Sequence, residues 1–409
     1  MKKMRTVNLI KKLDKKTFEA ITECVKVAEL SGIKIYLVGG IVRDALLSKN
    51  INDVDITVEG NAKEFVEILE CYASVKKVKY NENLPTAKVL FKNGVEIDFA
   101  STRAEVYEKF GDLPKIVKTG CPLKEDVVRR DFTVNAIAIS LNSENLFEVI
   151  DYLDGVKDLE RKKLRILHNK SFFDDPSRMI RGLKFAERLG FSLDEQTLNL
   201  QNEYLSNPLK NIPLERVKKE LKDLFSLNTK AAYNDFIKQK LYKLVMSGEG
   251  EFVSSQKIKE QLFSFDVADE DLWLLYFLSL FSGGNPQEKL NLTARENKII
   301  SEMHEFLQNK PVFQDKYSIY SYFINKDYLS VVFYAMFVDE EVAKTFFKIR
   351  KTKINTTGYD LQNLGIKQGK IYSEIQKNVL KEKINNGLKD KNAEILFIKE
   401  KLLTGENNG

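Results

Sequence analysis

The chain has 409 residues, of which 43% are apolar and 30% are charged, and its formal net charge is +6. This is the composition of an ordinary globular protein, and the length suggests roughly two to four domains. No stretch approaches the roughly 18 apolar residues of a membrane span, and the basic N-terminal segment lacks the apolar core of a signal peptide. We therefore expect a cytoplasmic protein without a membrane partner. The positive charge is compatible with a polyanionic ligand but does not require one.

Cysteine and histidine are scarce in this chain. Its three cysteines lie far apart and match no zinc-binding spacing, and its only histidines are His168 and His304. This scarcity disfavours a Ser-His-Asp triad, a His-rich zinc site and a phosphohydrolase with His-Asp ligands. We expect any catalysis to depend on carboxylates and an added metal ion.

Strand and helix patterns alternate in the first third of the chain. Hydrophobic periodicity predicts helices over 18–30 and 41–49 and strands over 33–38, 54–58, 87–92, 95–100 and 135–141. Asn93-Gly94, between two of these strands, is a strong signal for a two-residue hairpin. Beyond about residue 160 helical periodicity dominates, with breaks near 207–208, 282–286 and 355–358. The predicted fold class is α+β, with a catalytic head followed by a helical remainder.

The first candidate site combines a glycine turn with paired carboxylates. Gly39 and Gly40 lie where a strand ends and a helix begins, so backbone amides can approach a phosphate there, and Arg43 can reach the same group. Asp53 and Asp55 are two residues apart on the next strand and share one face. They repel each other unless a cation such as Mg²⁺ lies between them. Each pattern alone is more typical of a tight turn or a solvated strand face, whereas the two together favour a metal and nucleotide site.

Two further groups of polar residues are weaker candidates. Asp98, on the second strand of the predicted hairpin, is either a third carboxylate of the site or an exposed strand residue. Near the strand over 135–141, Arg130 suits a phosphate, while Asp131 and Asn135 suit the hydroxyl groups of a ribose. Without other context, a solvated charged loop explains this second group better.

The last candidate block begins a helix. An aspartate followed by a proline, as in Asp175-Pro176, is typical of a helix start. Apolar residues then form one stripe, and basic residues gather on the other side, namely Arg178, Arg181, Lys184 and Arg188. A capped surface helix with solvated charges is the alternative interpretation.

In this order the blocks resemble one family, the class II tRNA nucleotidyltransferases and bacterial poly(A) polymerases. The matching motifs are Gly-Gly-x-Val-Arg-Asp, Asp-x-Asp, Arg-Arg-Asp-Phe-Thr-x-Asn-Ala and Asp-Asp-Pro-x-Arg. The resemblance extends from about Lys34 to Gly190, and it returns at 357–361 and 364–369, which is similar to the family's tail motif.

The resemblance implies a template-independent polymerase that adds C, C and A to the 3′ end of tRNA from CTP and ATP, with Mg²⁺ as cofactor. It also implies a domain order. A nucleotidyltransferase head of the DNA polymerase beta type, with a mixed sheet, would span 1–150. An all-α neck that recognises the base, a body and a tail that binds tRNA would span 151–225, 226–310 and 311–409.

The family's functional residues fall on the same candidates. Asp53 and Asp55 correspond to its metal ligands, and Asp98 would help to activate the attacking hydroxyl. Nucleotide contacts would come from Gly39, Gly40, Arg43, Arg130, Asp131, Asn135, Asp175, Arg178, Arg181 and Lys184.

Among these contacts, Asp175 would accept a hydrogen bond from the exocyclic amine of C or A, and Arg178 would donate to the neighbouring ring acceptor. U and G carry a carbonyl in place of that amine, so the carboxylate would reject them. Lys184 replaces a family arginine, which keeps the charge but loses the planar fork. In the tail motif, Lys367 and Lys370 either contact RNA or are solvated lysines of a helix–helix connection.

Three alternatives remain open at this stage. A bacterial poly(A) polymerase shares the head motifs but carries a Gly-basic-basic-Phe signature where this chain has Lys79–Leu84. A partial enzyme that adds only CC or only A would differ in the loop over 103–124, which is not obviously truncated. A non-catalytic RNA-binding protein need not retain the intact set of Asp53, Asp55, Arg130, Asp175 and Arg178.

Overall fold

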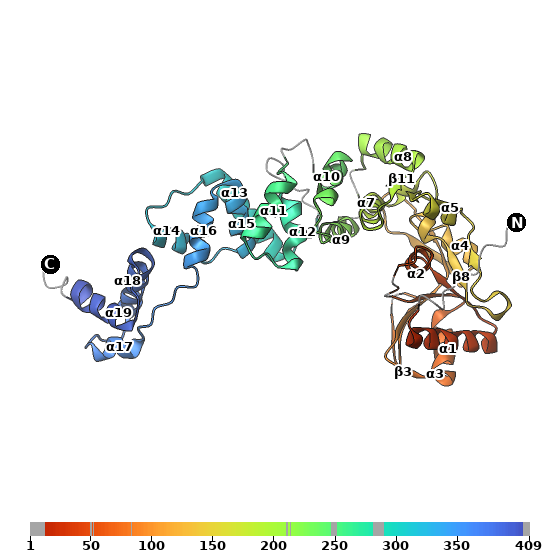
Figure 1. Cartoon of the computed structure of the whole chain (residues 1–409), viewed down its shortest axis with the longest axis horizontal. Helices are drawn as coiled ribbons and strands as arrows, with labels where there is room; N and C mark the ends of the chain where they lie inside the picture. Colours follow the sequence, from red (N-terminus) through yellow and green to blue (C-terminus); the bar gives the residue numbers. More distant parts are fainter. Residues whose placement is uncertain are drawn as a thin grey trace. The chain divides into compact units, whose positions relative to one another are not determined.

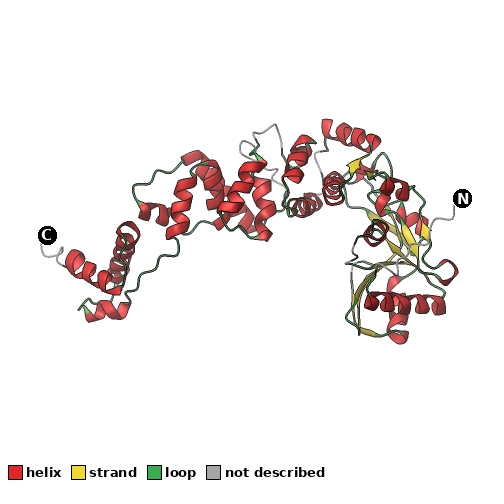
Figure 2. Cartoon of the chain, viewed as in Figure 1, coloured by secondary structure: helices red, strands yellow, loops and turns green. Residues whose placement is uncertain are grey.

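The computed structural model describes residues 13–403 except 50, 52, 83, 210, 211, 213, 247–251 and 281–289. The chain divides into two compact units, Met1–Ser247 with Gln287–Leu290 and Gly248–Pro286 with Asn291–Gly409. Sheets and helices make up the first unit, whereas the described residues of the second form helices and connections (Figures 1 and 2). This confirms the predicted α+β head followed by a helical remainder. The break expected at 282–286 lies outside the described residues, and the finer division into head, neck, body and tail stays a prediction.

A seven-stranded mixed sheet forms the centre of the first unit. Its strand order is β3-β4-β5-β2-β1-β8-β9, and only the β2–β5 pair is parallel. The strands are β1 Lys34–Val38, β2 Asp55–Glu59, β3 Val75–Tyr80, β4 Thr86–Phe91, β5 Glu96–Ser101, β8 Ala138–Ser140 and β9 Val149–Ile150. Two smaller pairs join β6 Arg103–Val106 to β7 Lys115–Thr119, and β10 Lys163–Leu164 to β11 Ser192–Leu193.

Alternating burial orients the strand that carries the paired aspartates. Val54 and Ile56 are buried, whereas Asp53 and Asp55 are exposed, as the period of two predicts. Asp55 is the first residue of β2, and Asp53 lies just before that strand. Helices α1 (Lys15–Ser31) and α3 (Ala62–Tyr72) pack together, and α3 contacts β2, β4 and β5. The apolar side of these strands is thereby covered, and the aspartates face away from the core.

Two predicted elements are shorter in the structure than the sequence pattern suggests. The helix predicted over 41–49 is α2, Gly40–Leu46, which ends before Ser48 adopts a φ of 60°. The strand predicted over 135–141 begins only at Ala138, because Thr133–Asn135 form a turn of 3-10 helix. Side chains hold that turn, since Asn135 donates to Asp131 and Thr133 donates to Asp158. Such local bonds compete with strand pairing.

Helices complete the first unit, and α7 among them contains the basic residues of the last candidate block. They are α4 Leu123–Val127, α5 Gly155–Glu160, α6 Ser171–Asp174, α7 Ser177–Leu189, α8 Glu195–Ser206, α9 Leu214–Phe225 and α10 Lys230–Lys238. Helix α7 packs against α9 and α10. Gly182 lets α7 lie close to Phe132, because a Cβ at this position would be 3.0 Å from that ring. A buried edge-to-face contact between Phe132 and Phe185 continues the same interface.

The second unit is built from helices around aromatic side chains. The helices are α11 Ser255–Ser264, α12 Leu272–Leu278, α13 Ala294–Asn309, α14 Lys316–Phe323, α15 Tyr328–Phe337, α16 Glu340–Ile349, α17 Gly358–Asn363, α18 Lys370–Asn386 and α19 Lys391–Phe397. Phe306, Phe323 and Tyr334 meet at its centre. A separate small core joins α17, α18 and the segment at Phe397 and Ile398 around Leu361 and Val379. Among the described residues, no helix combines the length and apolar character needed to cross a membrane.

Candidate functional site

One cavity of about 1780 Å³ in the first unit collects the predicted site residues of that unit. It lies between the polar side of the sheet, the glycine turn and helices α7 and α9. Its lining includes every predicted catalytic, metal and nucleotide residue: Gly39, Gly40, Arg43, Asp53, Asp55, Asp98, Arg130, Asp131, Asn135, Asp175, Arg178, Arg181 and Lys184. Residues far apart in sequence therefore share one site.

Glycine is required at position 39 by the backbone conformation and by a close neighbour. Gly39 has a φ of 88°, and a Cβ there would lie 3.2 Å from Nη1 of Arg130. Arg43, one turn into α2, is only 3% exposed. Its Nε and Nη2 donate to the two carboxylate oxygens of Asp44, both at 2.9 Å, and its Nη1 donates to Asn135 Oδ1 at 2.7 Å. The guanidinium is thus held in place at the cavity wall.

Three carboxylates lie together on the polar side of the sheet. Asp55 and Asp98 are register neighbours on the parallel strands β2 and β5, and Asp53 precedes β2. The pKa of Asp55 is raised above its usual value, first by withdrawal from water and then by the charges of Asp98 and Asp53, against the opposing effect of Arg130 and Lys88. A cation between the carboxylates would relieve this repulsion.

This donor set fits a magnesium ion that is shared with a nucleotide. Within the described residues, no three His, Cys, Asp or Glu side chains form a complete metal cage. Mg²⁺ is usually held by one or two carboxylates together with substrate phosphates and water. Asp53 and Asp55 can supply those carboxylates, because both are exposed to the cavity.

A buried aspartate that the sequence did not single out holds Arg129 and Arg130, the arginine pair that precedes β8. Asp126, whose side chain is fully buried, accepts from Arg129 Nη2 and Arg130 Nη2, each at 2.8 Å. Burial disfavours the charged form of this carboxyl, but the two guanidinium groups outweigh it, so the pKa of Asp126 lies below its usual value. Arg130 is therefore held beside Gly39. The spacing of three and four residues on a helical turn was the available signal.

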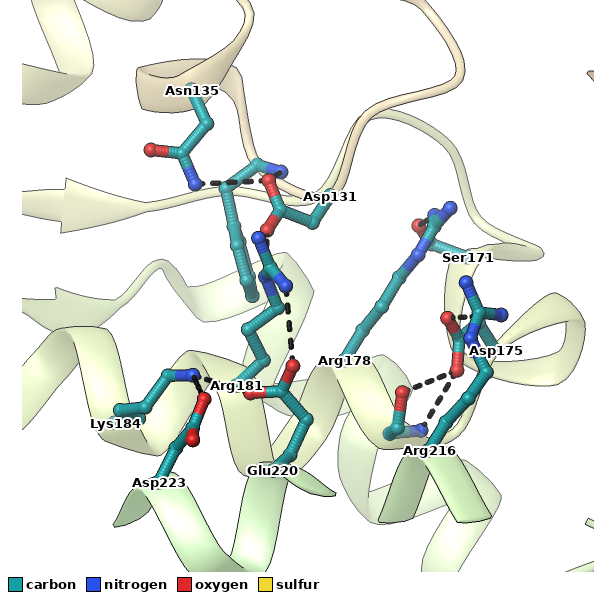
Figure 3. A network of polar contacts seen from close by, with 12 residues as sticks. Asp131, Asn135, Ser171, Asp175, Arg178, Arg181, Lys184, Arg216, Glu220 and Asp223 are labelled. Atoms are coloured by element: carbon teal, nitrogen blue, oxygen red, sulfur yellow. Dashed lines mark hydrogen bonds and ion pairs between the residues drawn. The ribbon is translucent and has the colours of Figure 1, made fainter. Parts of the chain in front are cut away.

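A chain of ion pairs connects Asp131 to helices α7 and α9 (Figure 3). Asp131 accepts from the Nε of Arg181, and Nη1 of Arg181 donates to Glu220 Oε1 at 3.2 Å. Lys184 Nζ then bridges Glu220 Oε2 at 2.6 Å and Asp223 Oδ2 at 2.8 Å. Burial opposes the charge of Asp131, but Arg181 and the donors around it lower its pKa below the usual value. Lys184 is thus part of an ion-pair network that joins two helices.

The proposed base-reading pair is also held by its neighbours (Figure 3). Asp175 is 5% exposed; its Oδ1 accepts from the backbone and hydroxyl of Ser177, and its Oδ2 lies 2.8 Å from Nη1 of Arg216. Arg178 is equally buried and donates to Ser171 Oγ and to the carbonyl of Arg129. Asp174 is the last residue of α6 and does not line the cavity. Pro176, not the aspartate before it, is the N-cap of α7, and Asp175 ends α6 as its C-cap.

Arg216 and Glu220 are site residues that the sequence analysis did not identify. Both lie on α9, four residues apart, and Asp223 follows Glu220 by one further turn on the same side. An amphipathic helix with a charged face looks identical when that face is solvated. Only the packing of α9 against α7 shows that this face lines the cavity.

The two predicted tail residues lie in the second unit. Lys370 begins α18, Lys367 lies in the connection that precedes it, and both are exposed. Neither lines the cavity. Their proposed contact with RNA is therefore a separate question from nucleotide binding.

Comparison with known proteins finds a matching head domain and similar tRNA nucleotidyltransferases. Residues 35–165 match the poly(A) polymerase head domain. The A-adding tRNA nucleotidyltransferase of Geobacter sulfurreducens is 29% identical over 91% of this chain, which covers 46% of that protein. That of Halalkalibacterium halodurans is 29% identical, over 90% of this chain and 88% of the relative.

A solved structure of a CCA-adding enzyme in an apo form shares 25% identity and a TM-score of 0.81, with coverage of 99% of this chain and 100% of that one. The chain spans about half the length of the first curated relative, and nearly all of the second relative and of the solved structure. The matched head domain contains the paired aspartates, the glycine turn and the arginine pair. The chain thus resembles tRNA nucleotidyltransferases over most of its length and carries a head domain that matches the poly(A) polymerase family model.

Proposed function

We propose that this chain is a template-independent tRNA nucleotidyltransferase that adds C, C and A to the 3′ end of tRNA from CTP and ATP, with release of pyrophosphate. The observation that carries the proposal is that one cavity holds both the Asp53–Asp55 pair and the Asp175–Arg178 pair. The first pair suits phosphoryl chemistry and the second suits recognition of a base edge. The similarity to known proteins supports this assignment, because the named relatives act on tRNA or add CCA.

The proposed reaction joins the 3′-hydroxyl of the RNA to the α-phosphate of the nucleotide. A new O–P bond forms as the hydroxyl releases its proton to solvent, the bridging P–O bond between the α- and β-phosphates breaks, and pyrophosphate leaves with that electron pair. Asp53 and Asp55 would hold Mg²⁺, which when bound supplies charge stabilisation and makes the hydroxyl more acidic. Arg130, held by Asp126, would orient the triphosphate. Asp98 would orient the attacking hydroxyl.

Base selection would rest on Oδ2 of Asp175. Both hydrogen bonds from Ser177 go to Oδ1, whereas Arg216 forms an ion pair with Oδ2 without a hydrogen bond from its Nη1. An exocyclic amine, as in C or A, would donate to Oδ2. A carbonyl oxygen at the same place, as in U or G, would repel the carboxylate.

The experiment that tests this proposal measures addition to three forms of one tRNA. These are tRNA without the CCA end, tRNA without the final A, and complete tRNA, each incubated with every single nucleotide and with CTP plus ATP. We expect C, C and A on the first form, A on the second and no addition to the third. Transfer to none of them would contradict the proposal, and a long A tract on unrelated RNA would indicate a poly(A) polymerase.

Addition of A alone is a second candidate, and it is favoured by one observation. The two curated relatives compared above are both named A-adding tRNA nucleotidyltransferases. The loop over 103–124, in which partial enzymes would differ, contains the β6–β7 hairpin and reaches Arg178 through the hydroxyl of Tyr107 at 3.4 Å. Addition of A to the second form of tRNA, without addition of C to the first, would select this candidate.

A further inference from the structure

A lysine that no motif identifies lies beside the three carboxylates of the cavity. Lys88, on β4, lies directly opposite Asp98 on β5, and Asp98 lies opposite Asp55 on β2. The ammonium group of Lys88 is 3.0 Å from Asp98 Oδ2 and 2.9 Å from Glu96 Oε1. Lys88, Asp98 and Asp55 therefore form a row across three adjacent strands, with the ammonium group of Lys88 at one end.

This arrangement makes Asp98 different from the other two aspartates. Its carboxylate already has a cationic partner, the ammonium group of Lys88, which also pairs with Glu96. Asp53 and Asp55 have no such ion pair within the part of the chain that the structure describes. A divalent ion that recruited Asp98 as a third ligand would have to displace Lys88 or accept its positive charge nearby.

We propose that Lys88 is a positioning residue that withholds Asp98 from a divalent ion in the nucleotide-free protein. The free protein then offers only Asp53 and Asp55, and the ion binds firmly only when nucleotide phosphates complete its ligands. This inference rests on the metal site of the proposed function. It adds that binding of the metal depends on the nucleotide because of a lysine outside the family motifs.

The test measures the affinity of the nucleotide-free, full-length protein for Mn²⁺ by titration calorimetry. Lys88→Met should lower the dissociation constant by roughly tenfold, the size expected for removing one charge close to a divalent ion in a largely solvated site. Lys79→Met is the matched control, because Lys79 pairs in register with Lys88 one strand farther from Asp98 and also lines the cavity. The control should change the affinity by less than about twofold, since solvent and salt screen the longer separation.

A double-mutant cycle separates an effect through Asp98 from a general effect of charge. If Lys88 acts by withholding Asp98, Lys88→Met should tighten Mn²⁺ binding in the wild-type background and lose most of that effect in an Asp98→Asn background. Equal tightening in both backgrounds would overturn the inference. So would a Lys88→Met protein that binds Mn²⁺ no more tightly than wild type or than Lys79→Met.

The titration requires no nucleotide transfer, so its failure differs from a failure of the proposed function. A protein without transferase activity in which Lys88→Met still tightens Mn²⁺ through Asp98 would contradict only the proposed function. An active protein in which Lys88→Met leaves the affinity unchanged would contradict only the role of Lys88.

Discussion

The two carboxylate oxygens of Asp175 make different contacts, and one substitution can separate their effects. Its Oδ1 accepts from the backbone and hydroxyl of Ser177, the first residue of α7. Its Oδ2 faces Arg216 at the cavity. A serine at this position can still accept from Ser177, but it cannot offer a charged acceptor to a base. The helix can therefore be retained while recognition is removed.

We predict that Asp175→Ser lowers the ratio of kcat/KM for CTP over UTP by roughly tenfold or more, since one base-edge contact is worth about 1–3 kcal/mol. The measurement is single-nucleotide addition to tRNA without its CCA end. Asp174→Ser is the control, because this neighbouring carboxylate does not line the cavity. A ratio within about twofold of wild type, far less than a lost base contact should cost, would show that Asp175 serves only the helix.

Asp55 provides a prediction about stability and pH. Folding raises the pKa of this carboxyl above its usual 3.8, so the folded state binds the proton more tightly. Ionising Asp55 therefore costs stability, and that cost is absent below the usual pKa and develops as the pH rises through the raised value. In chelator, Asp55→Asn should stabilise the protein at about pH 7, by no more than about 1 kcal/mol because solvent screens an exposed carboxylate.

The gain in the free energy of unfolding from Asp55→Asn should disappear as the pH approaches about 4, where an unperturbed aspartate is half protonated. Denaturant unfolding at both pH values measures it, and Asp112→Asn, at an exposed position outside the cavity, is the control. A larger gain at the lower pH would have the wrong sign and would contradict the repulsion between Asp55, Asp53 and Asp98.

At the scale of elements, local patterns predict the strands and turns well and the side-chain networks poorly. The hairpin at Asn93-Gly94 forms where it was predicted, because its turn residues and the alternation of β4 and β5 are neighbours in sequence. The strand over 135–141 was predicted too long, because its first residue, Asn135, donates to Asp131 and belongs to a turn of 3-10 helix. The contact between Asp175 and Arg216 joins separate helices, and no local pattern encodes it.

The contacts between α7 and α9 indicate a structural role for Lys184, which stands where the resembling family has an arginine. Lys184 is 14% exposed and bridges Glu220, which is 7% exposed, to Asp223. We predict that Lys184→Met lowers the free energy of unfolding by about 1–3 kcal/mol, between the values for exposed and buried ion pairs, because Glu220 loses one of its two cations. Lys184→Arg keeps the charge and should lose less. Denaturant unfolding of the three proteins measures the difference, and equal stability of Lys184→Met and wild type would show that the bridge contributes nothing.

At the scale of the whole molecule, the second unit carries the tail motif on a core of its own. Glu394 is fully buried and accepts from the backbone of Asn355 and Thr356 and from Lys383. Asn385 of α18 bonds to Asp315 and Tyr317 at the start of α14. Deleting the chain from about Asn355 would therefore disturb α14 as well as remove the tail. Substitutions on the surface are the cleaner test of RNA binding.

We predict that replacing both Lys367 and Lys370 by alanine weakens tRNA binding and makes its salt dependence shallower, while the addition of a nucleotide to a very short RNA at high concentration is unchanged. Each lysine that neutralises a phosphate contributes about 0.9 to the slope of log K against log salt, so two lysines should remove about 1–2. Both side chains are exposed and lie outside the cavity, which is why catalysis should not change. The control replaces Lys257 and Lys389, which are exposed lysines of the same unit. Binding isotherms at several salt concentrations measure the slope. If both double variants lose the same small affinity with parallel slopes, Lys367 and Lys370 are solvated lysines, and tRNA is held elsewhere on the chain.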